Sequence, residues 1–483
     1  MADHPVLIAT SNQRPKQLHI VMFPWLAFGH IIPYLELAKL MAAKGHRISF
    51  VSTTRNIDRL PKIPPNLSHL IHLVKLKLQP VENLPLDAEA TTDVPLDKVE
   101  YLKLASDKLQ GEMTEFLQLA NPDWILYDFT APWISPVAKR LDIPCAYFSI
   151  FIPAVICFIP VPTSDMLQIE EDRRTPEQFT VRPKWIPFET SVAFHLHEIT
   201  KIFSSVEGVT ASGITDMERL VASLRDCDLI CIRACKQFDP EWIQLAEKLH
   251  GKPVIPVGQL PTAANDNEAD NSSSSNHDHW LQIKGWLDQQ RPASVIYVSF
   301  GSEAKPTQEE VTELAYGLET CGLPFFWVLR TRRGEADQEA VKLPQGFEDR
   351  IGMRGLVYTS WVPQLRILSH ESVGGFLSHS GWSSVVEALQ CAKPLVLMTF
   401  LAEQGLNARV LEEKKIGYPL PRRKTDGWFS RGAVAQSVRL VVVEEEGRVY
   451  REKAKEMSRL FGDRVLQDSY TDNLLALLAS WIQ

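Results

Sequence analysis

A strand–helix–strand pattern near the start of the chain constrains the fold more than any other feature. An apolar run over residues 18–25 predicts a strand, and a turn is predicted at residues 27–30. Apolar residues then recur at helical spacing over residues 31–44, and a second strand is predicted over residues 47–52. Two strands joined through a helix lie parallel, with a right-handed crossover. The sequence therefore predicts a parallel, doubly wound α/β domain.

The same rhythm continues and then begins again in the second half of the chain. Further strands are predicted at residues 123–127, 144–150, 294–300, 325–330, 356–359, 375–377 and 395–399, with helices at 131–141, 307–320 and 381–390. A polar, acidic, serine-rich segment at residues 263–279 separates the halves and is typical of a flexible linker. A chain of 483 residues also exceeds what one hydrophobic core usually serves. We predict two Rossmann-like domains facing a cleft, with ligands at the carboxyl ends of the strands.

Charge and composition exclude several kinds of partner. The net charge of −8 argues against nucleic acid, because phosphate binding needs a basic surface. The most apolar stretch, residues 145–162, is nearly long enough to span a membrane, but Pro153, Pro160 and Pro162 interrupt it. We predict a buried strand there, followed by an apolar loop that lines a pocket.

The N-terminal residues and the cysteines indicate a cellular compartment. The first 17 residues lack a basic region followed by a long apolar run, so we expect no secretory signal. Seven scattered cysteines, an odd number, argue against a disulfide framework. We therefore expect a cytoplasmic monomer with reduced cysteines and no membrane insertion.

The most informative segment is residues 361–404. Within it a short strand runs into Ser378-His379-Ser380-Gly381 and then a helix. A glycine there lets the backbone approach a ligand, and the new helix offers unpaired N–H groups and a positive dipole end to a phosphate. His379 and Ser384 add side-chain donors, Glu387 can accept from ribose hydroxyls, and Trp361 offers a flat face to a base.

This segment resembles the plant secondary-product glycosyltransferase box. The matching residues are Trp361, Pro363, Gln364, His370, Gly375, His379, Gly381, Trp382, Ser384, Glu387, Pro394 and Gln404. The stretches FPWLAFGHIIPYLELAKLMAAKGHRISFVST and SVIYVSFGSE extend the resemblance over the whole chain. The sequence is thereby identified as a member of the plant family 1 UDP-dependent glycosyltransferases. The resemblance implies the GT-B fold and inverting, metal-independent transfer from a UDP-sugar, with no other cofactor.

The resemblance also implies domain functions and site residues. The N-terminal domain, residues 1–258, would bind the acceptor, and a linker at residues 259–279 would follow it. The C-terminal domain, residues 280–455, would bind the UDP-sugar. The helices at residues 456–483 would pack back on the N-terminal domain. Trp361 would stack on uracil, and the Val362 backbone would form a hydrogen bond with it. The ribose would be held by Gln364 and Glu387, and the diphosphate by Ser302, His379, Gly381 and Ser384. The residues that face the transferred sugar would be Trp382, Glu403 and Gln404.

His30 and Asp128 are the predicted catalytic pair. Each follows a predicted strand at its carboxyl end, and each matches a catalytic position of the family. A neutral imidazole can remove the proton of an attacking hydroxyl near pH 7. Asp128 would fix the tautomer of His30 and stabilise the imidazolium that forms.

Three positions of the box depart from its commonest form. Ser380 replaces a cysteine, Ser383 an asparagine and Glu403 an aspartate. With the shorter Ser383, a contact near the donor phosphate is lost or bridged by water. Ile150 and Phe151 are apolar where glucose-using relatives carry threonines that meet the C6 hydroxyl, and an apolar wall suits a methyl group. Both UDP-glucose and the 6-deoxy donor UDP-rhamnose therefore remain open.

The N-terminal sequence resembles a branch that extends the sugar chains of terpenoid, steroid or flavonoid glycosides, often through a 1→2 bond. A free aglycone as acceptor, a nucleotide-sugar epimerase and a non-catalytic UDP-sugar binder remain alternatives. Asp226-Cys227-Asp228 matches a metal-binding triplet of another glycosyltransferase fold, although it leads directly into a strand-like run. The pairs His195/His197 and His277/His279 lack further metal ligands and are predicted to be solvated surface residues.

Overall fold

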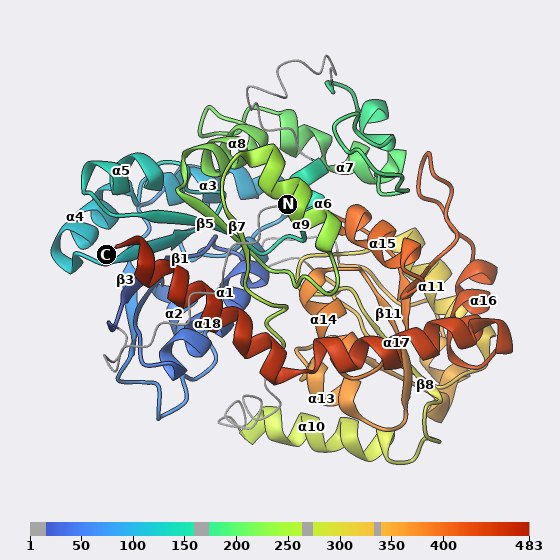
Figure 1. The fold of residues 1–483 in the computed structure, drawn as a ribbon. Coiled ribbons are helices and arrows are strands. Elements are labelled where there is room, and N and C mark those ends of the chain that lie inside the picture. The colour runs from blue at the N-terminus through green and yellow to red at the C-terminus, as the bar shows by residue number, and fades with distance from the viewer. Residues whose placement is uncertain (1–15, 159–172, 263–273, 333–339, 483) are drawn as a thin grey trace.

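The computed structural model describes residues 16–158, 173–262, 274–332 and 340–482, and it contains two parallel β-sheets (Figure 1). The N-terminal sheet has seven strands in the order β3-β2-β1-β4-β5-β6-β7. They are β1 (His19–Phe23), β2 (Arg47–Thr53), β3 (Ile71–Leu76), β4 (Trp124–Tyr127), β5 (Cys145–Ser149), β6 (Leu229–Ile232) and β7 (Val254–Pro256). The C-terminal sheet has six strands in the order β10-β9-β8-β11-β12-β13. They are β8 (Val295–Ser299), β9 (Phe325–Val328), β10 (Gly355–Tyr358), β11 (Val373–Ser378), β12 (Leu395–Leu397) and β13 (Gly417–Pro419).

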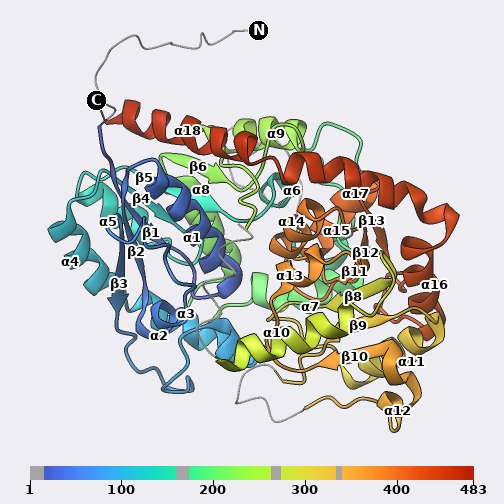
Figure 2. The same ribbon diagram turned by 90° about the horizontal axis from the view of Figure 1, so that it is seen from below.

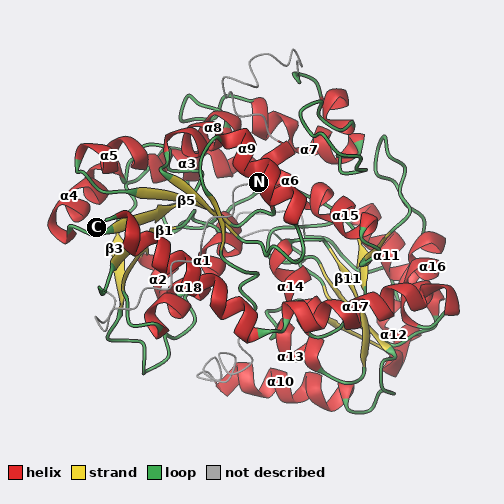
Figure 3. Cartoon of the chain, viewed as in Figure 1, coloured by secondary structure: helices red, strands yellow, loops and turns green. Residues whose placement is uncertain are grey.

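Helices lie on both faces of each sheet, so the predicted doubly wound α/β class is confirmed (Figures 1, 2 and 3). In the N-terminal half they are α1 (Phe28–Ala43), α2 (Thr54–Asp58), α3 (Val99–Asp107), α4 (Gln110–Ala120), α5 (Ile134–Arg140), α6 (Pro153–Phe158), α7 (Leu196–Glu207), α8 (Asp216–Asp226) and α9 (Pro240–His250). In the C-terminal half they are α10 (Ser274–Leu287), α11 (Gln308–Cys321), α12 (Phe347–Ile351), α13 (Gln364–Ser369), α14 (Trp382–Gln390), α15 (Gln404–Glu413), α16 (Arg431–Val442), α17 (Arg448–Phe461) and α18 (Arg464–Trp481).

The strands are apolar on both faces because helices cover both sides of the sheet. In β1, Val21 and Phe23 belong to one core cluster, whereas Ile20 and Met22 belong to the other. This alternation is the two-residue period of a strand. It explains why the sequence of β1 is a continuous apolar run.

Strand register brings the predicted catalytic residues to one edge of the sheet. β1 pairs with β4 in parallel, with Phe23 opposite Tyr127. The segments that follow these two positions therefore leave the sheet at the same edge, and they carry His30 and Asp128.

The last two helices join the two halves of the molecule (Figures 1 and 2). α17 packs on α14, and α18 lies against α1 and β7 of the N-terminal half. The ion pair of Lys44 with Asp472 at 2.8 Å and the bond from Trp124 Nε1 to the carbonyl oxygen of Leu478 at 3.0 Å fix α18 in place. The boundary predicted between residues 455 and 456 falls inside α17, whose last residue, Phe461, already packs on Phe238 of the N-terminal half with 5.3 Å between the ring centroids.

Two local predictions were wrong. Residues 274–279, predicted as part of the linker, form the start of α10, while residues 263–273 lie outside the described residues. The segment after β5, predicted as a loop, contains α6, whose residues are all buried. Pro153 is the first residue of this helix, a position at which the helix needs no N–H group and proline is favoured.

None of the helices in the described ranges is long and apolar enough to cross a membrane.

Packing of α11 against α16 gives a stability prediction. A Cβ at Gly317 would lie 2.5 Å from Val434 Cβ and 2.9 Å from the carbonyl oxygen of Arg431. We expect Gly317→Ala to lower the free energy of unfolding by about 2 kcal/mol, because the core is overpacked. A Cβ at Gly111 in α4 would meet no described side chain within 4 Å. As the control, Gly111→Ala should raise stability by roughly 0.5–1 kcal/mol. Thermal and urea unfolding measure both, and a shift of the same sign in both variants would contradict this packing.

Candidate active site

His30 and Asp128 form a hydrogen-bonded pair. His30 lies in the first turn of α1, which begins at Phe28 and not after residue 30 as predicted. Its Nδ1 lies 2.7 Å from Asp128 Oδ2. The carboxylate is 1% exposed and also accepts from the backbone N–H groups of Trp25 at 3.1 Å and Phe129 at 2.8 Å. Because an ionised carboxylate only accepts, the Nδ1 atom carries the proton and Nε2 keeps its lone pair.

Asp128 also determines the protonation of His30. Burial by itself lowers the pKa of His30, but the charge and hydrogen bond of Asp128 outweigh it, and Glu403 and Glu303 add smaller attractions. The net pKa of His30 is raised above its ordinary value. The neutral imidazole that can accept a proton is therefore the form present above this raised pKa.

Aromatic rings enclose the imidazole. The ring of Phe151 meets it edge-on at 5.6 Å between centroids, and that of Phe129 lies at 5.8 Å. Phe151 follows β5, and with the neighbouring Ile150 it supplies the apolar residues that the sequence analysis singled out. His30 therefore has an apolar wall formed by residues of the N-terminal domain.

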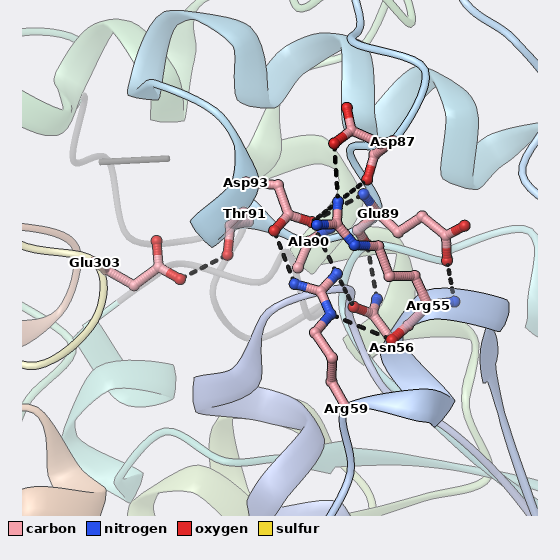
Figure 4. A network of polar contacts seen from close by, with 9 residues as sticks. All are labelled: Arg55, Asn56, Arg59, Asp87, Glu89, Ala90, Thr91, Asp93 and Glu303. Atoms are coloured by element: carbon pink, nitrogen blue, oxygen red, sulfur yellow. Dashed lines mark hydrogen bonds and ion pairs between the residues drawn. The ribbon is translucent and has the colours of Figure 1, made fainter. Parts of the chain in front are cut away.

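Two carboxylates of the C-terminal half lie near enough to His30 to attract its positive charge. Glu303, in the connection from β8 to α11, accepts a hydrogen bond from Thr91 Oγ1 of the N-terminal half at 2.6 Å (Figure 4). The backbone N–H of Thr91 donates to the carbonyl oxygen of Leu26, in the segment that leads to His30, at 2.9 Å. Glu403 immediately precedes α15, and burial raises the pKa of its carboxyl group. Polar groups therefore lie near His30 in addition to the apolar wall.

A network of ion pairs and hydrogen bonds holds Thr91 in place (Figure 4). The Arg59 guanidinium donates to both oxygens of Asp93, at 2.7 and 2.8 Å. Asp93 Oδ2 also accepts from the backbone N–H of Ala90 at 2.8 Å. The sequence analysis missed this network and Glu303, because no sequence spacing links residues 91 and 303.

The turn between β11 and α14 is built around His379. Ser380 adopts φ +68°, and Gly381 precedes the helix. A Cβ added at Gly301 would lie 2.8 Å from Nε2 of His379, and a Cβ added at Gly381 would lie 2.3 Å from the same atom. Both glycines are therefore needed to admit the ring. Burial lowers the pKa of His379 to about 4, so this imidazole is neutral at physiological pH.

The predicted ribose residues contact one another. Gln364 Nε2 donates to Glu387 Oε2 at 2.8 Å and to Ser384 Oγ at 3.0 Å. Burial raises the pKa of Glu387. Trp361 is 48% exposed and Val362 is buried beside it. An exposed indole next to buried hydrogen-bonding groups is suited to stacking on a base.

The structure also locates the remaining predicted donor residues. Ser302 is exposed in the connection from β8 to α11, next to Gly301. Gln404 Oε1 accepts from the backbone N–H groups of Phe400 at 2.9 Å and Leu401 at 3.0 Å. Its side-chain oxygen therefore fixes the segment between β12 and α15.

Two predicted donor residues contact the N-terminal half through their side chains. The indole of Trp382 is 4% exposed, donates to Gln259 Oε1 at 2.9 Å and packs on Phe238. The indole therefore fills the interface between the two halves, and the contact of Trp382 with the sugar stays a prediction. Ser383 Oγ accepts from Arg233 Nη1 at 2.7 Å, so its side chain also contacts the N-terminal half.

The acidic triplet has structural contacts. Asp226 pairs with Arg225 at 2.7 Å, and Asp228 Oδ2 accepts from the backbone N–H of Cys145 at 2.8 Å. Among the residues with described positions, no three His, Cys, Asp or Glu side chains are grouped to hold a metal ion. Asp228 thus connects β5 to the start of β6, and Asp226 is ion-paired at the end of α8.

His195 and His197 are not the solvated surface residues that were predicted. His197 is buried, and His195 contacts Arg409 of α15 at 3.1 Å. Nearby, Glu198 accepts a hydrogen bond from Thr399 at 2.6 Å. The start of α7 therefore belongs to the interface between the two halves.

Comparison with known proteins identifies the group to which this site belongs. The family model described as UDP-glucoronosyl and UDP-glucosyl transferase matches residues 266–469. UDP-glycosyltransferase 91A1 of Arabidopsis thaliana is 51% identical over 467 residues, 96% of this chain and 97% of the relative. Soyasaponin III rhamnosyltransferase of Glycine max is 38% identical over 483 residues, 99% of this chain and 98% of the relative. The crystal structure of Glycyrrhiza uralensis UGT73P12 complexed with glycyrrhetinic acid 3-O-monoglucuronide superposes with a TM-score of 0.77 at 21% identity, covering 96% of each chain.

The contact between His30 and Asp128 gives a titration prediction. We expect Asp128→Asn to lower the pKa of His30, because the neutral amide neither attracts the imidazolium nor opposes the effect of burial. NMR titration of the His30 ring resonances measures the shift. The matched control is Asp226→Asn, which replaces a carboxylate paired with Arg225 and should leave the pKa of His30 unchanged. An unaltered His30 midpoint in Asp128→Asn would contradict the assigned electrostatics.

Proposed function

The chain belongs to the plant family 1 UDP-glycosyltransferases, and we propose that it transfers a hexose from UDP-glucose or UDP-rhamnose to a small-molecule glycoside. The acceptor is a terpenoid, steroid or flavonoid glycoside, and the new bond forms 1→2 on its existing sugar. The observation that carries the proposal is the 2.7 Å contact between His30 and Asp128, with the rings of Phe129 and Phe151 beside it and the charges of Glu303 and Glu403 nearby. A cytoplasmic location is part of the proposal, and the unbridged state of all seven cysteines supports it.

The acceptor is activated by His30. Its Nε2 takes the proton of the acceptor hydroxyl while the hydroxyl oxygen attacks C1 of the donor sugar. Asp128 stabilises the imidazolium that forms, because it already bonds Nδ1. The bond from C1 to the diphosphate oxygen breaks on the opposite side, so the configuration at C1 inverts.

The leaving UDP is stabilised by electrostatics without a general acid or metal ion. The free N–H groups at the start of α14 and the positive end of its dipole suit a diphosphate. His379 and Ser384 lie at the same turn and can donate hydrogen bonds. These groups are present before the reaction, and such preorganised donors stabilise charge where it develops.

A glycoside acceptor is supported by the two kinds of surface around His30. Phe129 and Phe151 suit an apolar aglycone, whereas Glu303 with Thr91 can bind sugar hydroxyls. The Glycine max relative is named for rhamnose transfer and for a saponin.

Product analysis tests the proposal. UDP-glucose and UDP-rhamnose are each incubated with flavonoid and terpenoid glycosides and with the corresponding aglycones, and products are identified by mass spectrometry and NMR. We expect transfer to the glycosides with inverted C1 configuration and no effect of EDTA. His30→Ala should slow transfer by about 100-fold or more while UDP binding persists, since general-base catalysis contributes roughly 10²–10⁴-fold.

Each alternative predicts a different result. Turnover of UDP-sugar without acceptor would indicate an epimerase, and UDP binding without transfer to any acceptor would indicate a binding protein. Inhibition by EDTA would require a metal, and undiminished transfer by His30→Ala would remove His30 from the mechanism.

Thr91→Val tests recognition of the acceptor sugar. The substitution keeps the shape of the side chain but removes the hydroxyl that donates to Glu303. We expect kcat/KM for glycoside acceptors to fall by about fivefold, the effect of one hydrogen bond of about 1 kcal/mol, with less change for aglycones. Thr92→Val, at the neighbouring position, is the matched control. Equal losses for glycosides and aglycones would assign Thr91 to domain packing instead.

A further inference from the structure

A buried arginine of the N-terminal half reaches the first turn of α14. Arg233 directly follows β6 and is 3% exposed. Its Nε donates to the carbonyl oxygen of Gln259 at 2.8 Å, and its Nη1 donates to Ser383 Oγ at 2.7 Å. A longer contact of 3.4 Å joins Nη2 to the carbonyl oxygen of Leu260. Ser383 is the second residue of α14, so the guanidinium connects the two halves at the start of this helix.

No carboxylate in the described part of the chain forms an ion pair with Arg233; all three of its acceptors are uncharged. Glu387 and Glu36 attract it only over a longer distance. Each has a nearer partner, because Glu387 accepts from Gln364 and Glu36 pairs with Lys39 at 2.7 Å. Burial lowers the pKa of Arg233 to about 10, so the group still carries its charge at neutral pH. A buried charge is unfavourable unless an opposite charge completes the site.

The neighbouring turn needs a positive charge that its own residues do not provide. His379 is neutral at physiological pH, because burial lowers its pKa to about 4. The start of α14 contributes only the partial charge of a helix dipole, about half a unit. A diphosphate bound there carries more negative charge than this dipole balances. The unpaired cation and the uncompensated anion therefore complement each other.

We propose that Arg233 is a positioning residue for the donor: it holds the start of α14 through Ser383 and supplies the buried charge that the diphosphate balances. This inference rests on the proposed function, because it takes a UDP-sugar as the donor. Position 383, where the family usually has asparagine, carries a serine here. The hydroxyl is the acceptor that the guanidinium uses.

Because Arg233 belongs to the N-terminal half, its charge links donor binding to contact between the two halves. A ligand that carries the diphosphate binds more tightly because of the charge of Arg233, whereas the affinity of a ligand with only base and ribose does not depend on that charge. Comparing UDP with uridine therefore separates this role from a general structural one.

The experiment measures the dissociation constants of UDP and uridine by isothermal titration calorimetry for the wild type, Arg233→Gln and Arg233→Lys. Glutamine keeps a side-chain donor for the carbonyl oxygen of Gln259 but has no charge. We expect Arg233→Gln to raise the dissociation constant of UDP about tenfold and that of uridine less than about twofold, in line with the strength of charged hydrogen bonds. Arg233→Lys, which keeps the charge, should recover most of the UDP affinity.

The remaining outcomes overturn the inference. Equal losses for UDP and uridine would mean that Arg233 only supports the fold, and unchanged UDP affinity would mean that its charge is not used. If Arg233→Gln does not fold, as judged by thermal unfolding, Ser383→Ala replaces it. We expect Ser383→Ala to raise the dissociation constant of UDP about threefold and to leave that of uridine unchanged. The hydrogen bond between Arg233 and Ser383 is lost in this variant, while the charge of Arg233 remains. A wild type that fails to bind UDP would instead contradict the proposed function.

Discussion

The hydrogen bond between His30 and Asp128 is the constraint on which the rest of the N-terminal domain depends. Its partners come from different β–α connections, so they meet only if β1 and β4 are neighbours in register. That pairing requires a parallel sheet with both faces covered, and the apolar strands provide it. The carboxylate is in turn fixed by the backbone N–H groups of Trp25 and Phe129. A change of register by one residue would separate the pair.

Catalysis also requires that the two sheets keep a fixed relation, because the base and the donor turn lie in different halves. Direct contacts span the interface at separate places, including Thr91 with Glu303, Glu198 with Thr399 and Trp382 with Gln259. α18 adds a longer connection, since it crosses from α17 to α1. A reacting hydroxyl must approach C1 within a few tenths of an ångström of its proper place, which such a set of contacts can ensure.

The sequence was most informative where function depends on local pattern. Apolar runs located β1 and β4, and the family resemblance located His30, Asp128 and the turn at Gly381. Side-chain directions that depend on the other half of the molecule could not be predicted. The indole of Trp382 enters the interface, and His197 is buried there, although neither position has a local signal for it. Glu303 and Thr91 were missed for the same reason, since a contact between distant loops leaves no periodic trace.

His30 and His379 have opposite pKa shifts, and the difference follows from their neighbours. His30 is buried next to the Asp128 carboxylate, so its pKa is raised despite desolvation, whereas His379 is buried between two glycines and its pKa falls to about 4. Only His30 can therefore exchange a proton near neutral pH, which suits a general base. The neutral His379 can offer a diphosphate a hydrogen bond but no charge. The positive charge at the donor turn must then come from the helix terminus and from Arg233. His30 therefore takes the proton of the acceptor, while the start of α14 and Arg233 balance the charge of the diphosphate.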